Sequence, residues 1–475
     1  MSVLEIDRGV LIMNRVFALV LAAFFVLLAV RFHPRRALDP VRTFQRLAPR
    51  APFRSMLPLA PLVIGVTVLG VAIRREVRAG SGGDEQRKHT KDYWRRNVET
   101  WRDAPEPAIR RVELAIQLDP DANRMRVQGS YLLENDDALP LSSIPITTGR
   151  HYEDVAYSLD GATTTFEDRS GLHVVQLSTP LSPGASATLG FEHAGIFSGG
   201  TTENGGGASE FVLPCGVVLR SFGSSFAPWI GFFEDVGLEA EDRPNARDYP
   251  DDFHLGQTPS VLGTDAPYST RVVITVPDGW RANSVGELVA ESLADDRRTF
   301  TWVSDQPVNF FNVVAGRWTE RRGEGVVVHH HPTHVWNIDE ITRALEASRR
   351  RYSEWFGPFP WKELRLSEFP GIAGYAQGFP TNITFSEGIG FLTRSEPRAN
   401  AAFLVTAHEA AHQWWGNMVN PGKGPGGNVI AEGLSHFSTI LLHESELGVR
   451  ERIEFCKGTR ISTDRSARSI PSARS

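Results

Sequence analysis

The sequence predicts an α+β protein of several domains, and three observations lead to this expectation. Two apolar runs near the amino terminus, at about residues 10–30 and 56–73, are typical of transmembrane helices and define a membrane region over 1–87. Short stretches of alternating apolar and polar residues between turn residues predict an antiparallel β domain over 88–322. Helical periodicity then recurs between 323 and 458, which indicates a further domain that contains helices.

The first apolar run is unbroken from Val16 to Val30, and the residues 10–30 contain only Asn14 and Arg15 as strongly polar residues, a length sufficient to cross a bilayer. A cleaved signal peptide is the alternative, but Arg31 follows directly and no small-x-small cleavage site is present. For the second run, from Met56 to Ile73, a buried hydrophobic hairpin is the alternative. The basic loop 31–55 is expected to stay cytoplasmic, so we expect a multi-pass membrane protein whose later domains are extracytoplasmic.

Composition restricts the partners of the chain. The formal net charge is −6 and the overall composition is ordinary for a globular protein, so no nucleic-acid partner is expected. The segment 459–475 is rich in Ser and Arg and has few apolar residues, which predicts a disordered tail. We interpret this end as that of a fragment, or of a changed reading frame, rather than a natural carboxyl terminus.

The β domain is predicted from alternation of side-chain character with a period of two. Turn residues separate the candidate strands at short intervals, which is typical of antiparallel sheets. The candidate strands are 111–118, 124–133, 172–177, 187–192, 271–276, 299–303 and 309–316. A well-formed amphipathic helix follows at 338–356, and we expect its apolar face to pack in the core.

The chemistry of the chain is concentrated in one motif, His-Glu-x-x-His, at residues 408–412. The surrounding segment, 399–418, has apolar residues at helical spacing and lacks Pro, so we expect a helix. On a helix, His408 and His412 lie one turn apart on the same face, where both imidazoles can bind one Zn²⁺ at about 2.0–2.1 Å. Glu409 lies on the adjoining face, where it can take a proton from a metal-activated water.

A third ligand is available near the start of the next predicted helix, 429–442. Glu432 could fold back onto the two histidines and complete a site with one open position, as in catalytic zinc enzymes. The alternative is an amphipathic helix with two solvated or buried histidines. A second histidine group, at 329–331 and 334, follows a predicted strand, so neighbouring side chains point to opposite faces and are not expected to share one ion.

The segment from His408 to Asn417, followed by Ala431-Glu432-Gly433, resembles the M1 metallopeptidases, the gluzincin aminopeptidases. This resemblance implies an N-terminal β domain followed by a thermolysin-like catalytic domain, of which 323–458 would be a part. It implies that His408, His412 and Glu432 hold one Zn²⁺ and that Glu409 is the general base. It also implies a peptide substrate.

The chain departs from the family pattern at three places. Nineteen residues separate His412 from Glu432, one more than is usual in the family, and we expect the Gly- and Pro-rich loop between them to absorb the extra residue. The substrate-binding segment is matched by Gly374 to Gly378, where Gln377 replaces the glutamate that captures the substrate's amino group. No tyrosine follows Tyr375 in these residues, so the family's transition-state donor is not matched.

These observations lead to a membrane-anchored zinc peptidase with weakened turnover as the preferred function. The alternative is a non-catalytic, zinc-binding module that binds peptides or assembles with a transporter. Two helices before such a domain are similar in layout to bacterial fusions of ABC-2-type permease helices with M1-like domains, which would make transporter components and the lipid bilayer partners. Hydrolysis of a non-peptide substrate is a third possibility that no residue selects.

Overall fold

The computed structural model describes residues 8–32, 59–81, 84–101, 104–197, 209–233, 262–392, 394, 401–422 and 426–457. The predicted tail at 459–475 and the basic residues 33–55 lie outside these ranges. The chain divides into two compact units, one containing the amino-terminal helices and the other beginning at Lys88. Each unit is described by itself.

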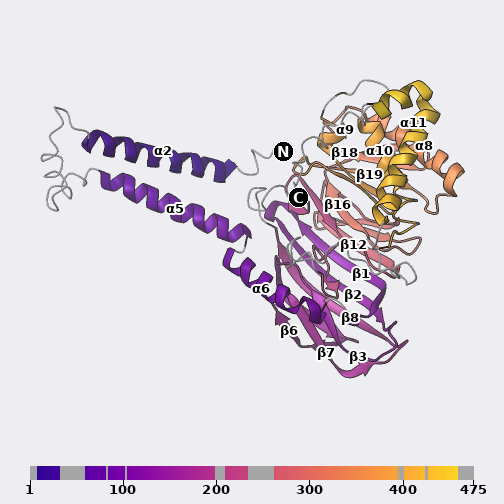
Figure 1. Ribbon diagram of the computed structural model, residues 1–475, viewed down its shortest axis with the longest axis horizontal. Helices are drawn as coiled ribbons and strands as arrows, with labels where there is room; N and C mark the ends of the chain where they lie inside the picture. The colour runs from indigo at the N-terminus through magenta and orange to yellow at the C-terminus, as the bar shows by residue number, and fades with distance from the viewer. Residues whose placement is uncertain are drawn as a thin grey trace, which may run out of the picture. The chain divides into compact units, whose positions relative to one another are not determined.

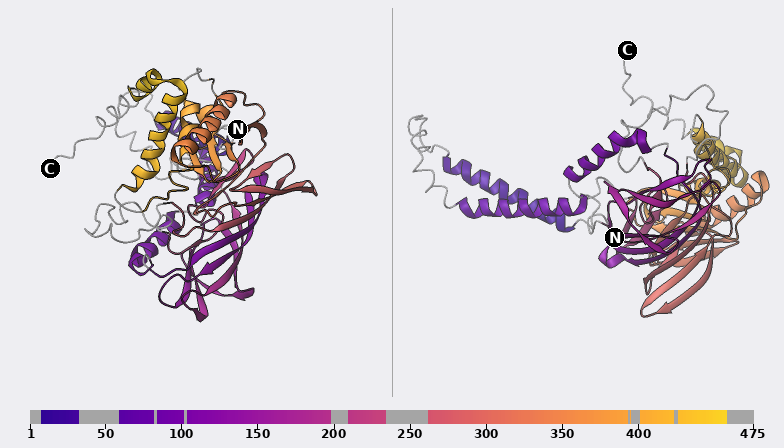
Figure 2. Two further views of the ribbon diagram at one scale, coloured as in Figure 1. Left: turned by 90° about the vertical axis from the view of Figure 1, so that its right-hand side faces the viewer. Right: turned by 90° about the horizontal axis from the view of Figure 1, so that it is seen from below.

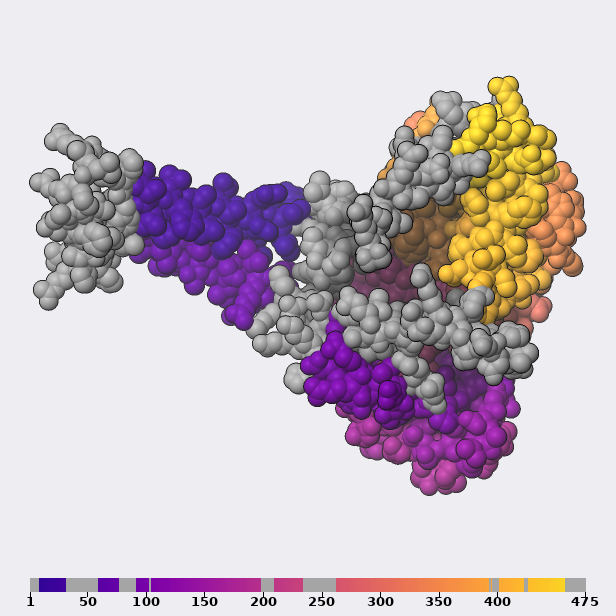
Figure 3. All heavy atoms as spheres, in the orientation of Figure 1, coloured from indigo at the N-terminus to yellow at the C-terminus, as the bar shows by residue number. Residues whose placement is uncertain are grey.

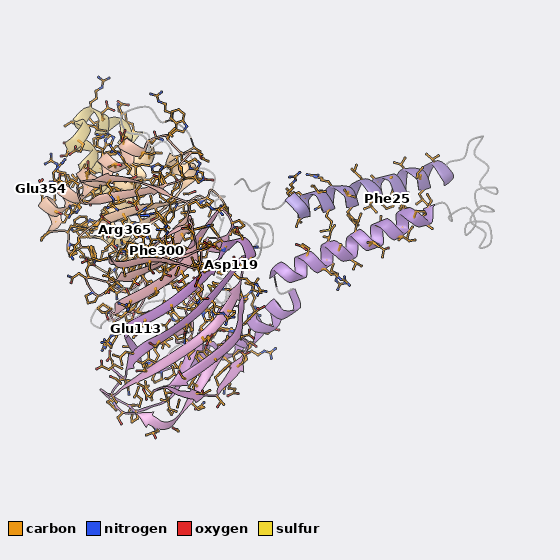
Figure 4. All side chains as sticks on the ribbon, turned by 180° about the vertical axis from the view of Figure 1, so that it is seen from behind. Phe25, Glu113, Asp119, Phe300, Glu354 and Arg365 are labelled. Atoms are coloured by element: carbon orange, nitrogen blue, oxygen red, sulfur yellow. The ribbon has the colours of Figure 1, made fainter. Side chains whose placement is uncertain are left out.

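The first unit contains two long helices, α2 (Arg8–Phe32) and α5 (Ala60–Ser81), which lie side by side (Figure 1). The two helices are in direct contact at Gly65, where a Cβ would lie at ordinary contact distance, 3.4 Å, from a methyl group of Val20. Many apolar side chains of α2 are exposed, among them Leu19 at 69% and Phe25 at 56% (Figure 4).

Among the described residues, α2 alone is long and apolar enough to cross a membrane, over Arg8–Val30. The prediction of two transmembrane helices is therefore corrected to one candidate. The apolar part of α5 runs from Ala60 to Ile73 and ends at Arg74 and Arg75. These apolar residues rise only about 21 Å at 1.5 Å per residue, less than the roughly 30 Å of a hydrocarbon core.

The second unit begins within α6 (Asp84–Trp101) and continues as a β-rich body with three sheets. Its eight-stranded sheet has the order β14-β15-β12-β1-β2-β8-β4-β5. The strands of this sheet are β1 (Ala108–Asp119), β2 (Arg124–Glu134), β4 (Tyr152–Leu159), β5 (Ala162–Thr164), β8 (Ser186–Ile196), β12 (Ser269–Pro277), β14 (Glu287–Ala294) and β15 (Arg297–Val303). A 3-10 turn, η2 (Pro120–Ala122), joins β1 to β2.

Two four-stranded sheets complete the β body. One contains β13 (Arg281–Asn283), β16 (Asn312–Gly316), β10 (Gly216–Arg220) and β9 (Phe211–Leu213) in that order, and the other contains β11 (Trp229–Ile230), β3 (Leu141–Thr147), β7 (Leu172–Leu181) and β6 (Phe166–Arg169). Alternate residues of the strands enter a shared core, as Val112, Leu114 and Ile116 do along β1.

The expectation of a purely antiparallel domain needs one correction, because β1 and β12 pair in parallel. Parallel neighbours require a long crossover connection. The chain between Asp119 and Ser269 provides one, and alternation within each strand carries no information about the direction of its neighbour.

The remaining residues form a five-stranded sheet with helices packed on it (Figure 2). Its order is β17-β18-β19-β21-β20, and the central strands β18, β19 and β21 are parallel. The strands are β17 (Thr319–Gly323), β18 (Val326–His330), β19 (Leu364–Phe369), β20 (Ala376–Phe379) and β21 (Asn382–Ser386). The helices are α8 (Ile338–Phe356), α9 (Glu387–Gly390), α10 (Ala401–Ala411), the π-helical turn η6 (Val429–Gly433) and α11 (Leu434–Leu447).

A buried arginine joins the β body to the five-stranded sheet. Arg365 on β19 is 3% exposed, and its Nη2 donates to the carbonyl oxygens of Ser284 at 2.9 Å and Gly286 at 2.8 Å (Figure 4). The same nitrogen donates to Oγ1 of Thr381 at 2.9 Å, in the turn between β20 and β21. These bonds join the turn between β20 and β21 to the residues that follow β13.

Candidate metal centre

The first half of the site lies at the carboxyl end of α10. The helix ends at Ala411, so the predicted helix to Met418 is too long. The backbone tightens after this point, since Gln413 N–H donates to the carbonyl of Ala410, three residues earlier, at 3.1 Å. His412 keeps its place one turn after His408, because its N–H still donates to the His408 carbonyl at 3.3 Å. The two imidazole rings lie with their centroids 4.8 Å apart.

Glu432 reaches both imidazoles from η6. Its Oε2 lies 3.2 Å from Nε2 of His408 and 3.7 Å from Nε2 of His412. One ligand atom from each of these residues thus falls within 4.8 Å of the others. The Glu432 side chain is 63% exposed, so one side of the group is open to solvent. Figure 3 shows the surface formed by the carboxyl-terminal residues, which are drawn in yellow.

The backbone around Glu432 suggests where the extra residue between His412 and Glu432 is accommodated. Residues Val429–Gly433 form a π-helical turn that runs directly into α11. A π turn closes its hydrogen bonds over one residue more than an α turn, and such turns are frequent at functional sites. The Gly- and Pro-rich loop is the predicted place for the extra residue, but residues 423–425 of that loop lie outside the described part. The π-helical turn η6 offers a second place for it.

Neighbouring groups orient the ring of His412. Its Nδ1 lies 3.0 Å from the carbonyl oxygen of Trp415 and 3.1 Å from Oγ of Ser435. A carbonyl can only accept, so this contact places the proton on Nδ1 and leaves the Nε2 lone pair directed at Glu432. Metal-binding histidines are commonly oriented in this way by a hydrogen bond to the other ring nitrogen.

Glu409 is buried beneath the ligand group and is 7% exposed. Burial is the main cause that raises its pKa to about 7, and the nearby Glu432 adds to the effect, whereas the charge of His408 opposes it. Its carboxylate also accepts the backbone N–H of Gly378 on β20. A Cβ on Gly378 would lie 2.5 Å from the carbonyl oxygen of Glu409 and 2.9 Å from Cβ of His412, so β20 and α10 approach closely only because this residue is glycine.

The pKa values of the two imidazoles shift in opposite directions. Burial lowers the pKa of His412. Burial also opposes protonation of His408, but its hydrogen bond with Glu432 and the charge of Glu409 together raise its pKa. The hydrogen bond from His408 lowers the pKa of Glu432, which keeps this carboxylate ionised.

The donor set and spacing fit a zinc ion. Tetrahedral bonds of about 2.0–2.1 Å place ligand atoms about 3.3–3.4 Å apart, close to the separations of Glu432 from the two imidazoles. Two imidazoles and one carboxylate are also the ligand types of several catalytic zinc sites. The chemistry of His408, His412 and Glu432 is therefore suited to holding one such ion with an open position.

The predicted substrate-binding residues lie on and just before the edge strand β20. Gly374 is exposed and no atom lies within 4 Å of where its Cβ would be. Gln377 is half-buried, and its Oε1 accepts a hydrogen bond from Nη1 of Arg220 at 3.1 Å. Sequence reasoning missed Arg220 and its partner Glu210, because both are distant in sequence and neither belongs to a recognisable motif.

Comparison with known proteins agrees with this geometry at the level of the fold. No family model matches the chain, and no curated protein matches it either. Among solved structures, the M1 zinc metallopeptidase of Deinococcus radiodurans is similar, with 17% identity and a TM-score of 0.50 over 77% of this chain and 76% of that one. A substituted form of that enzyme, bound to a Tyr-Ser-Ala substrate, gives 17% identity and a TM-score of 0.51 over 75% of each chain. The chain therefore has an M1-like fold, as its sequence led us to expect.

Proposed function

We propose that the chain is a zinc-dependent peptidase of the M1 type. In this proposal, His408, His412 and Glu432 hold one Zn²⁺ and Glu409 is the general base. The observation that carries the proposal is the convergence of these three ligand atoms within 4.8 Å beside a buried carboxylate. The M1-like fold supports the same function.

A zinc ion bound here would lower the pKa of a bound water towards about 7 and polarise the scissile carbonyl. Glu409 then accepts the proton of the attacking water and donates it to the leaving amine. Without a metal ion, burial raises the pKa of Glu409 above its ordinary value, and this favours uptake of the proton by the carboxylate. The Gly378 N–H holds the carboxylate in place during this transfer.

The edge strand β20 offers a place for an extended peptide. It is the last strand of the five-stranded sheet and pairs only with β21 among the described strands. A peptide can add to such an edge through main-chain hydrogen bonds. Because β20 also lies against α10 at Gly378, a peptide there would pass beside Glu409.

The surroundings of Gln377 argue against strong capture of a free amino terminus. Oε1 of Gln377 is already engaged by Arg220, and Oε1 of Glu210 accepts the Arg220 backbone N–H at 2.8 Å while it faces the guanidinium at 3.5 Å. The acceptors that a substrate ammonium group would need are therefore partly occupied. We infer a peptidase with little preference for a free amino terminus.

Membrane anchoring through α2 is part of the proposal. The exposed apolar side chains of this helix would be solvated by lipid rather than water. Extraction of the full chain from membranes by detergent but not by alkaline carbonate is expected. Release by carbonate would contradict anchoring.

The substitution Glu409→Gln tests the function. It removes the base, keeps the shape of the side chain and leaves the proposed ligands intact, so peptide hydrolysis should fall by about 10²–10⁴-fold while zinc content stays the same. Glu153→Gln, at an exposed position on β4, is the matched control and should retain full activity. Equal activity of Glu409→Gln and the control would refute the assignment of the base.

A non-catalytic peptide-binding module is the second candidate, and the engaged state of Gln377 favours it. In that case wild-type protein would bind zinc and peptide but release no product above the Glu409→Gln level. The same experiment therefore separates the two functions.

A further inference from the structure

An imidazole lies between two carboxylates at the carboxyl ends of the three parallel strands. His334 lies in the turn after β18, Glu368 is near the end of β19, and Glu387 directly follows β21. Nδ1 of His334 contacts Oε1 of Glu368, and its Nε2 lies 4.0 Å from Oε2 of Glu387. The two carboxylates therefore face opposite nitrogens of one ring.

The balance of charge at this place depends on the proton of His334. The side chain of Glu368 is 4% exposed and that of Glu387 is 14% exposed. Within the described ranges, neither carboxylate forms an ion pair with Arg or Lys. The other titratable group that faces the ring is His331 on the same turn, with the ring centroids 5.1 Å apart. Buried carboxylates are costly unless they are paired, so an imidazolium at His334 offsets a cost that a neutral ring does not.

The two protonation states of His334 differ in how many carboxylates they can serve. An imidazolium carries an N–H on both nitrogens, whereas a neutral imidazole carries one N–H and one lone pair. Glu368 is the more firmly placed carboxylate, because its Oε2 also accepts the backbone N–H of His331 at 2.6 Å. The neutral ring would donate to Glu368 and turn its lone pair towards Glu387.

The surroundings keep the proton on His334 rather than on its neighbour. Hydrogen bonding to Glu368 is the main cause that raises the pKa of His334, and the charge of Glu387 adds to the effect while burial opposes it. Burial and the charge of His334 lower the pKa of His331. Nδ1 of His331 accepts the backbone N–H of Thr333 at 3.3 Å, so this nitrogen carries no proton.

Glu387 connects this proton to the segment 370–375. Its other oxygen, Oε1, accepts the N–H of Gly371 at 2.8 Å. The far end of the segment is held by Ser386 of β21, which donates its N–H to the carbonyl of Tyr375 at 3.1 Å and its Oγ–H to that of Ala373 at 2.7 Å. The segment leads directly into β20, the edge strand that would bind a peptide. Movement of Glu387 would therefore release the start of that edge.

We propose that His334, Glu368 and Glu387 form a proton-dependent clasp on the segment 370–375. With His334 protonated, Glu387 stays beside the ring and holds Gly371. With His334 neutral, Glu387 turns to solvent and Gly371 loses its acceptor. The pKa of His334 is raised in the folded chain, so the clasp is closed below the ordinary value of 6.5 and opens as the pH rises through the folded-state value.

Hydrogen–deuterium exchange of the detergent-solubilised full chain tests the clasp. Exchange is followed by mass spectrometry between about pH 6 and pH 9, corrected for the intrinsic pH dependence of amide exchange, on fragments that contain residues 371–375. We expect the protection of these amides to fall by about tenfold as the pH rises, because a hydrogen bond to a charged group is lost. Fragments from β1 and β2 are the internal reference and should show no such step.

Three variants identify the group that titrates. His334→Gln should give low protection at every pH, because a neutral amide cannot balance the two carboxylates. Glu387→Gln should keep high protection without a step, since its amide needs no cation and its oxygen can still accept the Gly371 N–H. His331→Gln is the matched control and should retain the wild-type step. A wild type without a step, or a step that survives in His334→Gln, would overturn the clasp.

The effect of the clasp on peptides rests on the proposed function, whereas the exchange measurement does not. A step that is lost in His334→Gln supports the clasp even in a chain that hydrolyses no peptide. In a chain that does, KM should rise over the same pH range in the wild type but not in Glu387→Gln. Equal pH dependence of KM in these two proteins would overturn the link between the clasp and the peptide-binding edge.

Discussion

The close approach of β20 to α10 makes Gly378→Ala an informative perturbation. The added Cβ would lie 2.5 Å from the Glu409 carbonyl oxygen, whereas ordinary contact begins near 3.4 Å, so the two elements must separate by about 0.9 Å. Gly378 also donates its N–H to the Glu409 carboxylate, so the shift moves the base from its position. A misplacement of about 1 Å in a catalytic group can cost about 10²-fold in rate.

The assay is the initial rate of cleavage of a fluorogenic peptide, measured with the zinc content of the same samples. We expect kcat to fall by about 10²-fold in Gly378→Ala with the zinc content retained, and the free energy of unfolding to fall by about 1–3 kcal/mol from overpacking. Gly388→Ala is the matched control, because its Cβ would meet only ordinary contact at 3.8 Å. Activity of Gly378→Ala within threefold of the control would refute the argument that this contact positions the base.

Three further predictions concern stability, pH and specificity. Arg365→Met removes the guanidinium donor to the buried carbonyl oxygens of Ser284 and Gly286, whereas Oγ1 of Thr381 still accepts the N–H of Gly286. It should lower the free energy of unfolding by about 3–5 kcal/mol in chemical denaturation. The exposed Arg126→Met should change it by less than about 0.5 kcal/mol, and equal effects would contradict the bridging role. Burial lowers the pKa of His193 to about 4, so below its ordinary pKa of 6.5 the unfolded chain binds a proton that the folded chain does not, and stability should fall between pH 6.5 and 4 by on the order of 3 kcal/mol. His193→Gln should lessen this pH dependence in denaturation curves, and an unchanged slope would count against it. Peptides with free and acetylated amino termini should have kcat/KM values within a few-fold of each other. Capture of an ammonium group contributes about 1.5–3 kcal/mol, or about 10- to 150-fold, only where a charged acceptor is free. A preference above tenfold for the free amine would contradict this.

The local features of the molecule were the most predictable from sequence. The spacing of His408 and His412 depends only on helix geometry within one turn, and the alternation along β1 reports burial directly. The M1-like fold followed from the same short motif and is confirmed by the structural comparison. Each of these inferences needed only residues close together in the chain.

Features that depend on distant residues could not be predicted. Arg220 meets Gln377 across 157 positions in sequence, and Glu368 and Glu387 meet His334 only because three strands are parallel neighbours. The pattern of the histidine group at 329–331 and 334 reports only which side chains alternate along one strand. It gives no information about Glu368 and Glu387, which contact His334 from the ends of neighbouring strands. The prediction of a second transmembrane helix was too generous, because it rested on the apolar run alone and the arginines within α5 shorten the apolar part of that helix.

The most direct test of the account is the position of zinc in an anomalous difference map, recorded from crystals of the zinc-loaded chain at the zinc absorption edge. We expect a peak bounded by Nε2 of His408, Nε2 of His412 and a carboxylate oxygen of Glu432. A map of well-ordered, zinc-loaded protein without a peak there, or with Glu432 turned away from the two imidazoles, would contradict the central claim.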